Sequence, residues 1–351
     1  MNKRYLPIVI LTLLFTLLAG GVWASHTERA GGQHFTLLDE QNKVVHQTGF
    51  EVYPGDIYIA ADNSRYRVVE IISDNTARCV YQGKETMPDI ADLETDASLL
   101  NREVPVVKTG QKPTIAVYHT HSDESYVPTD GKESINGNGG IYDVGEAMVN
   151  KFREMGFKVD YNKANHNPHD INAYNRSRKT AASLLKDQPD VILDVHRDAV
   201  PPDQYQTKVK GQEVTKIKLV VGRSNPNMKT NLEFAKKIKA VMDKKEPGLS
   251  NGIYMGKGSY NQDLSPRAML IEIGSHTNPK QDAEKAAALF ADVLPTVIGA
   301  SAAGTGTSTE PAAKPMTGDD QKAGSTLLII LVVVGAAIGI FYLINRGSTQ
   351  K

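Results

Sequence analysis

The segment TIAVYHTHSDESY spans residues 114–126 and changes character halfway along. Its first five residues, TIAVY, form a short apolar run of the kind that makes a buried strand, and the rest carries two histidines, an aspartate and a glutamate. In open α/β sheets, ligands bind beyond the carboxyl ends of the strands. The polar half of the segment therefore predicts a functional site at the edge of a sheet, against the alternative of an ordinary polar loop.

The chain around this segment alternates between two kinds of pattern. Apolar runs that predict strands occur at 114–118, 158–161, 191–195, 218–221 and 269–273. Amphipathic patterns that predict helices occur at 144–154, 174–186, 228–244 and 282–294. Strands that alternate with helices predict an α/β fold, in which helices flank a mostly parallel sheet. We assign this fold to residues 112–300.

Two more of these strands bring reactive side chains to the same edge of the sheet. His196 follows the run VILDV, and Glu272 lies near the end of AMLIEIG. An unpaired carboxylate inside an apolar strand is costly, so Glu272 is difficult to explain as a structural residue. Three segments that each deliver histidine or glutamate to one edge predict a metal site.

Zinc is the metal that these residue types favour. It binds histidine nitrogen and carboxylate oxygen in a tetrahedral arrangement, and a catalytic site keeps one position for water. The candidate ligands are His119, His121, Glu124 and His196. Water on such a zinc ion titrates near about pH 7, and Glu272 is suited to take its proton and pass it to a leaving amine.

Alternatives remain open for each of these ligands. A single histidine at the end of a strand is more often a hydrogen-bonded loop residue than a metal ligand. Glu146 competes with Glu124, because it lies at the start of a predicted helix. Three other histidines are weaker competitors, namely His166, His169 and His276.

Polar residues of the predicted helix 174–186 and of loops near the same edge are candidates for substrate binding. They are Arg178, Arg197, Asp198 and Asn261. Arg178 fits a surface ion pair equally well, and amide-rich loops such as 259–268 also suit ordinary turns. These loops would match a substrate made of amides and sugars.

Residues 27–105 follow a different pattern. Short alternating runs, such as YRVVEI at 66–71, are separated by turn sequences and predict a small β-rich domain with an antiparallel sheet or barrel. Cys79 lies within such a run and is best interpreted as a packed apolar residue. Because the chain has one cysteine, it can form no internal disulfide and no cysteine-based zinc finger.

The two ends of the chain predict export and membrane attachment. Residues 1–25 combine a basic start, an apolar run and small residues, as in a signal peptide or signal anchor. Residues 326–345 predict a transmembrane helix, since an apolar run of this length nearly spans a hydrocarbon core of about 30 Å. The small and polar residues of 301–325 predict a flexible linker. Basic residues prefer the cytoplasmic side, so we expect a cell-membrane protein whose central part lies on the outer face.

Composition excludes one broad class of function. The 351-residue chain has 40 basic and 40 acidic residues and a formal net charge of zero. A general nucleic-acid binder would carry a basic excess. We therefore expect no nucleic-acid partner.

Several motifs together resemble one family. VYHTHSDESYVP, YNRSRKTA, ILDVHRDAVP, VVGRSNPN and YNQDLSPRAMLIEIGSHTN occur in this order and are similar to those of the stage II sporulation protein P family of endospore-forming bacteria. The resemblance implies an amidase-like fold related to zinc-dependent N-acetylmuramoyl-L-alanine amidases. It implies cleavage of the amide between muramic acid and the stem peptide of peptidoglycan, and endopeptidase cleavage of crosslinked stems as a further activity. It also implies thinning of the septal wall during engulfment, in the septal intermembrane space, with stage II sporulation proteins D and M as partners.

The resemblance also carries roles for individual residues. It puts Glu272 in the position of the catalytic acid and base, and it puts the metal at His119, His121, Glu124 and His196. His121 is favoured over His119, because amidases of the wider superfamily have a Gly-His pair where this chain has Thr-His. Those amidases also place a glutamate ligand at a helix start, which keeps Glu146 as an alternative. The C-terminal hydrophobic segment departs from the family, whose better-known members are described with an N-terminal anchor.

Two other functions compete with a zinc amidase. A peptidoglycan-binding scaffold of the engulfment complex could keep the sheet without turnover, but the chain retains both histidine segments and Glu272. A zinc peptidase with an unrelated substrate would be recommended by a His-Glu-x-x-His motif, which this sequence lacks.

Overall fold

The computed structural model describes residue 29, residues 32–91 and residues 113–299, which belong to one compact unit. The predicted signal segment (1–25), linker (301–325) and transmembrane helix (326–345) lie outside these described residues. Within the described residues, none of the helices has both the length and the apolar character that crossing a membrane requires.

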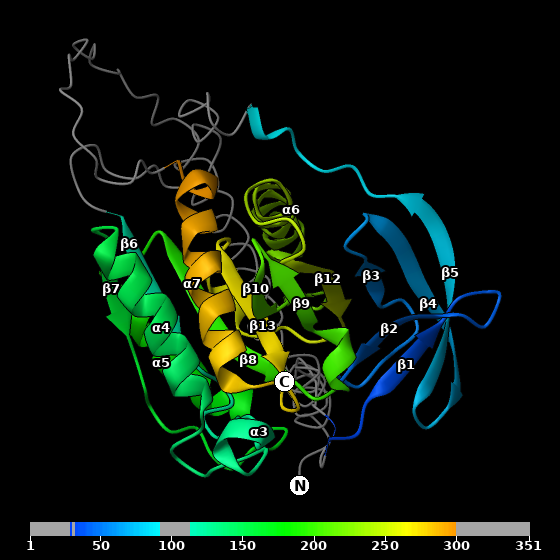
Figure 1. Ribbon diagram of the computed structural model, residues 1–351, viewed down its shortest axis with the longest axis horizontal. Helices are drawn as coiled ribbons and strands as arrows, with labels where there is room; N and C mark the ends of the chain where they lie inside the picture. Colours follow the sequence, from blue (N-terminus) through cyan, green and yellow to red (C-terminus); the bar gives the residue numbers. More distant parts are fainter. Residues whose placement is uncertain (1–28, 30–31, 92–112, 300–351) are drawn as a thin grey trace, which may run out of the picture. The chain divides into compact units, whose positions relative to one another are not determined.

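The described part of the chain is a mixed α/β structure (Figure 1). Its strands are β1 (Phe35–Leu38), β2 (Val44–Thr48), β3 (Ile57–Ile59), β4 (Ser64–Ser73), β5 (Thr76–Lys84), β6 (Thr114–Tyr118), β7 (Lys158–Tyr161), β8 (Val191–Asp198), β9 (Gln206–Val209), β10 (Gln212–Thr215), β11 (Ile217–Gly222), β12 (Ser250–Gly256) and β13 (Ala268–Ser275). Its α-helices are α3 (Val127–Asp130), α4 (Ile141–Glu154), α5 (Ala173–Leu184), α6 (Met228–Lys245) and α7 (Lys280–Val297). Short 3-10 helices are η2 (Leu185–Asp187), η3 (Pro202–Gln204) and η4 (Gln262–Leu264).

The strands and helices predicted for 112–300 are present in the predicted order. Strands β6 and β7 have the predicted bounds, whereas β8 continues past the predicted end at Val195 to Asp198. Strand β12 and the β9–β10 hairpin were not predicted. The sequence of β12, SNGIYMG, begins with polar and glycine residues and so lacks the apolar run that marks the other central strands.

Eleven of the strands form one sheet, in the order β2-β1-β5-β4-β3-β12-β11-β13-β8-β6-β7. From β12 to β7 the pairings are parallel, except that β11 and β13 are antiparallel. This confirms the mostly parallel sheet expected for 112–300. The carboxyl ends of β6, β8 and β13 consequently meet at one edge.

Helices cover one face of this sheet and a mixture of elements covers the other. Helices α4, α7 and α6 lie next to one another on the first face (Figure 1) and enclose the largest apolar core with alternate residues of the strands. Strand β8 contributes Val191, Leu193 and Val195 to that core. The alternate residues of β8 therefore point to the opposite face, where Ile192 packs with Ala181 and Leu184 of α5.

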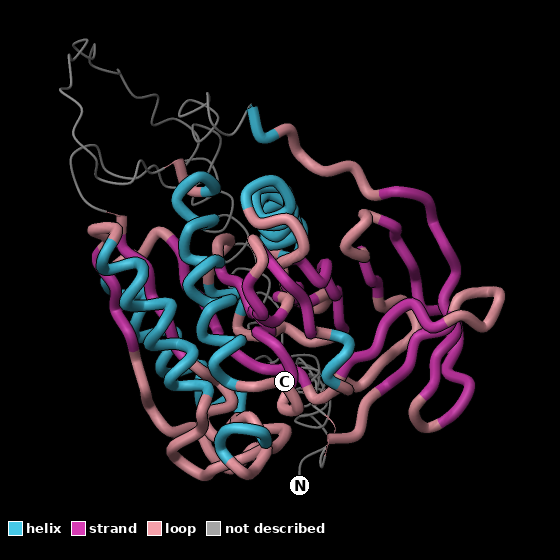
Figure 2. Tube along the Cα trace, in the orientation of Figure 1, coloured by secondary structure: helices cyan, strands magenta, loops and turns pink. Residues whose placement is uncertain are grey.

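The N-terminal strands extend this sheet and do not form a sheet of their own. Strands and loops make up nearly all of this segment (Figure 2). Its strand β3 pairs antiparallel with β12, Ile59 lying opposite Ile253. Gly252 permits the approach, because a Cβ there would overlap the Ile59 carbonyl oxygen. The small separate sheet or barrel expected for 27–105 is thus corrected to the outer half of one continuous sheet.

The same N-terminal segment covers the second face of the central strands. Phe35, Phe50 and Tyr58 pack with Val220 of β11, Tyr254 of β12 and Leu270 of β13 in a second apolar cluster. Cys79 is a buried member of this cluster, as expected for a packed apolar residue. An ion pair and a hydrogen bond reinforce the contact, since Arg223 pairs with the buried Asp56 and the fully buried Lys239 donates to the carbonyl oxygen of Ala61 at 2.9 Å.

A fragment of residues 112–300 is therefore expected not to fold. Without the N-terminal segment, Val220, Tyr254, Tyr260 and Leu270 lose the side chains that cover them. Each large apolar side chain contributes about 1.5–3 kcal/mol when buried. Exposing these four side chains would therefore remove most of the roughly 5–15 kcal/mol that is the typical free energy of unfolding of a domain. Circular dichroism and urea denaturation of this fragment against residues 29–300 test the expectation. A fragment that unfolds cooperatively at the same urea concentration as the longer chain would contradict it.

Candidate metal centre

Strand β8 supplies the central residues of the site. Residues 194, 196 and 198 alternate with the core valines, so Asp194, His196 and Asp198 share the face opposite the large helical core. Strand β13 runs parallel to β8 with Glu272 directly opposite His196. Residues in register on paired strands point to the same face, so His196 and Glu272 are buried neighbours at the carboxyl end of the sheet.

The loop that follows β6 brings the other two members to this face. Asp194 accepts hydrogen bonds from the backbone N–H of Thr120 at 2.7 Å and from its hydroxyl at 2.6 Å. These bonds hold the chain where it bends away from the strand. His121 and Glu124 follow the bend and are buried next to β8.

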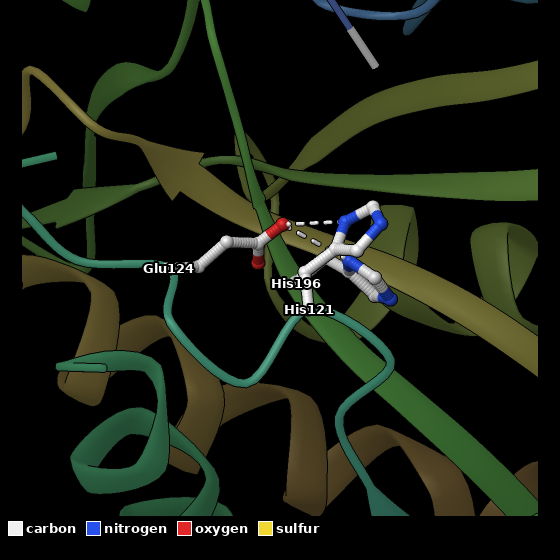
Figure 3. A group of neighbouring side chains, drawn as sticks. All are labelled: His121, Glu124 and His196. Atoms are coloured by element: carbon white, nitrogen blue, oxygen red, sulfur yellow. Dashed lines mark hydrogen bonds and ion pairs between the residues drawn. The ribbon is translucent and has the colours of Figure 1, made fainter. Parts of the chain in front are cut away.

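His121, Glu124 and His196 form a compact group of possible metal ligands, called here the three-donor group (Figure 3). Nδ1 of His121 lies 3.0 Å from Oε1 of Glu124, and Nδ1 of His196 lies 3.2 Å from the same oxygen. One possible ligand atom from each of the three residues lies within 4.8 Å of the others. The second oxygen of Glu124 accepts the backbone N–H of Arg197 at 2.9 Å, which fixes the carboxylate between the two rings.

Charge around His196 favours a cation at this point. Burial by itself would lower the pKa of His196, but the carboxylates of Asp194 and Glu124 outweigh it and hold the pKa well above the ordinary value. Nε2 of His196 lies 2.9 Å from Oδ1 of Asp194, an arrangement in which a carboxylate orients the imidazole. Asp194 was missed in the sequence, although the Asp-x-His spacing within a predicted strand places both residues on one face.

His119 lies outside this group. Its Nδ1 is 2.7 Å from the carbonyl oxygen of Val195 and its Nε2 is 2.8 Å from the hydroxyl of Tyr161, so both ring nitrogens have protein partners. Burial lowers the pKa of His119 to about 4, which keeps the ring neutral. The alternation of β6 continues through His119 and directs it to the face of α4, away from His196.

The competing ligands also lie apart from the three-donor group, with one exception. Glu146 pairs with Lys163 at 2.6 Å on the surface of α4. His166 is buried against the carbonyl oxygen of His119 and the hydroxyl of Thr180. His169 is the exception, since its ring stacks on that of His121 with centroids 3.8 Å apart. His276 is not in the group, and its backbone N–H donates to the carbonyl oxygen of Asp198.

The residues predicted to bind substrate are engaged within the protein. Arg178 binds the two oxygens of Asp263 at 2.8 and 2.5 Å, and Asn261 donates to the hydroxyl of Ser177 at 3.0 Å. The guanidinium of the buried Arg197 donates to the carbonyl oxygen of Glu133 at 3.2 Å. These contacts give each residue a structural role, and their contact with substrate stays a prediction.

A buried lysine, missed in the sequence, adjoins Glu272 on its other side. Lys218 of β11 lies opposite Glu272 and on the same face, and its ammonium pairs with Asp198 and donates to the hydroxyl of Thr48 at 3.1 Å. Asp198 also accepts the hydroxyl of Tyr205 at 2.9 Å and the backbone N–H of Gly49 at 2.8 Å. The N-terminal segment thus takes part directly in the surroundings of the site.

Lys218→Met is expected to destabilise the protein by about 3–5 kcal/mol, because it leaves the carboxylate of Asp198 buried without its cation. The double variant Lys218→Met with Asp198→Asn removes both charges and should recover much of this loss. Urea denaturation of both variants and the wild type measures the difference. Equal stability of the single and double variants would show that the ion pair is not what the lysine contributes.

The donor set fits a zinc ion. It offers two imidazole nitrogens and one carboxylate oxygen, the ligand types that zinc takes in catalytic sites. The group is buried, and the carboxylates of Glu124 and Asp194 lie 3.2 and 2.9 Å from the ring nitrogens of His196, so negative charge is available to balance a cation. His121, Glu124 and His196 are the residues that would hold the ion.

Comparison with known sequences finds one family. The model of a family described as Stage II sporulation protein P matches residues 37–295 of the chain. Stage II sporulation protein P of Bacillus subtilis strain 168 is 28% identical over 267 residues, which cover 70% of this chain and 66% of that protein. The chain therefore spans slightly less than two thirds of the length of this relative.

Comparison with solved structures finds several matches, which include amidases with low TM-scores. An N-acetylmuramyl-L-alanine amidase from Mycobacterium abscessus is 13% identical, with 53% of this chain and 96% of that one covered and a TM-score of 0.34. An N-acetylmuramoyl-L-alanine amidase from Clostridium difficile 630 is 15% identical, with 54% and 94% covered and a TM-score of 0.35. Scores at this level support no inference about the chain.

Proposed function

The chain belongs to the stage II sporulation protein P family, and from this premise we propose that it is an exported, membrane-tethered, zinc-dependent peptidoglycan hydrolase of sporulation. One observation carries the proposal. The buried donors His121, Glu124 and His196 lie beside a further buried carboxylate, Glu272, which is in register with His196 on the neighbouring strand. Three donors with an adjacent proton acceptor are the parts that hydrolysis at a metal centre needs.

The bond that we propose for cleavage is the N-acetylmuramoyl-L-alanine amide, with stem-peptide crosslinks as a second substrate. Amide hydrolysis requires a nucleophile, stabilisation of the developing negative charge and a proton for the leaving amine. A bound zinc ion supplies a Lewis acid and a water whose pKa is near about 7. The remaining requirement, the movement of a proton, falls to the protein.

Glu272 is the residue that meets this requirement. As a carboxylate it takes a proton from the attacking water, and as a carboxylic acid it returns that proton to the nitrogen of the leaving amine. Asp194 holds the ring of His196 from its far side, and the backbone N–H of Arg197 holds Glu124. Both contacts limit the reorganisation of the site during the reaction.

The setting of the reaction is also part of the proposal. Residues 1–25 and 326–345 would attach the chain to the cell membrane, with the hydrolase on the outer face in the septal intermembrane space. There it would thin the septal wall during engulfment, together with stage II sporulation proteins D and M. Fractionation of cells that express a truncation from Ser25 tests the export signal, since the truncated chain should remain in the cytoplasm.

Mass spectrometry of fragments released from purified sacculi tests the reaction. The full chain is purified in detergent, stripped of metal with a chelator and assayed before and after stoichiometric zinc is restored. Free stem peptides whose new amino terminus is L-alanine identify the amidase, and disaccharide-linked stems separated at the crosslink identify the endopeptidase. A chain that binds sacculi but releases neither product would be a scaffold, and the proposed function would be wrong.

A further inference from the structure

The N-terminal segment contains a hollow that the proposed reaction does not use. Its volume is about 590 Å³, within the range of small-molecule sites. It lies between the β1–β2 turn and strands β4 and β5, and its lining residues are Asp39, Glu40, Gln41, Ser64, Tyr66, Tyr81 and Lys84. These strands stand near the end of the sheet opposite β6 and β7, so the hollow is separate from the metal centre (Figure 1).

Two tyrosines give the hollow an aromatic lining. Tyr66 and Tyr81 are opposite one another on β4 and β5, with ring centroids 5.6 Å apart. Tyr66 packs against the second apolar cluster, whereas Tyr81 is 49% exposed. Tyr66 therefore supports one side of the pair, and the exposed ring of Tyr81 is available to stack on a ligand.

Hydrogen-bond acceptors beside these rings are held in place before a ligand arrives. Asp39 accepts the backbone N–H groups of Gln41 and Lys43 at 3.0 and 2.8 Å, and Glu40 accepts the backbone N–H of Tyr81 at 3.1 Å. A carboxylate has more acceptor positions than these bonds use. Acceptors that are already ordered lower the entropic cost of binding.

The charge of the hollow selects against acidic ligands. Asp39 and Glu40 contribute two negative charges, while the ammonium of Lys84 lies 2.7 Å from the carboxylate of Asp62, so its charge is already balanced. Anionic polymers and the carboxylates of stem peptides would be repelled. A neutral ligand with an apolar ring face and many hydroxyl donors fits both the rings and the acceptors.

We propose that this hollow is a glycan-binding subsite, which takes neutral N-acetylated sugars by stacking them on Tyr81 and accepting their hydroxyl protons at Asp39 and Glu40. The preference for N-acetylated sugars rests on the proposed function, because the wall glycan is the sugar that the chain would meet. The sugar class itself follows from the lining. The subsite lies toward the opposite end of the sheet from β6 and β7. It would hold the enzyme on the polymer and would not take part in bond cleavage.

Isothermal titration with chitohexaose, a neutral β-1,4 N-acetylglucosamine oligomer, tests the subsite. The full chain is used in a detergent without a sugar headgroup, so that the detergent does not compete. Tyr81→Ala is expected to weaken binding about tenfold. This change in affinity corresponds to the upper end of the energy range for one aromatic contact. Tyr81→Phe keeps the ring and should bind as the wild type does.

Matched controls separate the subsite from the fold and from the reaction. Ile72→Ala removes an apolar side chain that is 44% exposed on the same strand pair but does not line the hollow, and it should leave the affinity unchanged. His196→Ala should bind chitohexaose as tightly as the wild type, because the subsite needs no metal. Maltohexaose, which lacks the N-acetyl groups, should bind more weakly.

The outcomes decide this inference apart from the proposed function. No binding of chitohexaose at millimolar concentration, or equal binding by Tyr81→Ala and the wild type, would overturn the subsite even if sacculi are hydrolysed. Binding that Tyr81→Ala weakens would support the subsite even if no hydrolysis is found. Equal affinity for both oligosaccharides would support a sugar site and reject the preference for N-acetylated sugars.

Discussion

Glu272→Gln is expected to lower the rate of sacculus hydrolysis by about 10²- to 10⁴-fold, the usual contribution of a general acid or base. The substitution keeps the size of the side chain and removes its ability to carry a proton between water and amine. Glu272 is fully buried opposite His196 and is not among the three grouped donors. The zinc content of the variant should therefore equal that of the wild type.

Initial rates of fragment release, together with zinc stoichiometry, measure this effect. Glu146→Gln is the matched control, because Glu146 is a carboxylate of the same domain that is paired with Lys163 at the surface. It should hydrolyse sacculi at the wild-type rate. The assignment fails if Glu272→Gln remains as fast as this control, or if Glu272→Gln is slow only because it has lost zinc.

His196→Ala is expected to lose zinc and hydrolysis together, whereas His119→Ala should keep its zinc. His196 contributes one of three donors, and its removal leaves Glu124 and His121 as an incomplete set. His119 bonds to Val195 and Tyr161 on the other face of the sheet. Its loss leaves buried polar groups without a partner and should cost about 1–3 kcal/mol of stability without affecting the ligands.

Elemental analysis after dialysis against a weak chelator compares the two variants directly. The folded fraction of each variant is isolated first by size exclusion, so that unfolding is not mistaken for loss of a ligand. Zinc retained by folded His196→Ala, or lost from folded His119→Ala, would mean that the ligand set is wrong. His121→Ala and Glu124→Ala should behave as His196→Ala does.

The relation between sequence and site is clearest at the segment 114–126. Its apolar half predicts β6 to the residue, and the rule for strand ends predicts where the polar half collects. The family resemblance favours His121 over His119, but no local pattern in the sequence gives the physical reason. The choice depends on the bend at Thr120, which Asp194 holds from another strand, and this contact joins residues 74 positions apart.

The N-terminal segment shows the same limit on a larger scale. Alternating runs predict its strands, but no local pattern in 27–105 indicates that β3 will pair with β12 or that Thr48 and Gly49 will contact Lys218 and Asp198. Such pairings are specified by the fit of two distant surfaces. When the segments 27–105 and 112–300 are interpreted separately, they predict two domains, whereas their strands form one sheet.

The sequence by itself determined the alternation of strands and helices in 112–300, the family and the three segments that carry histidine or glutamate, because periodicity and motifs are local properties of a chain. The tertiary structure decided which side chains meet. The face of a strand, the direction of a bend and the partner of an edge strand depend on contacts between residues far apart in the chain. These contacts grouped His121, Glu124 and His196, set Glu272 beside them, and turned His119 and Glu146 away.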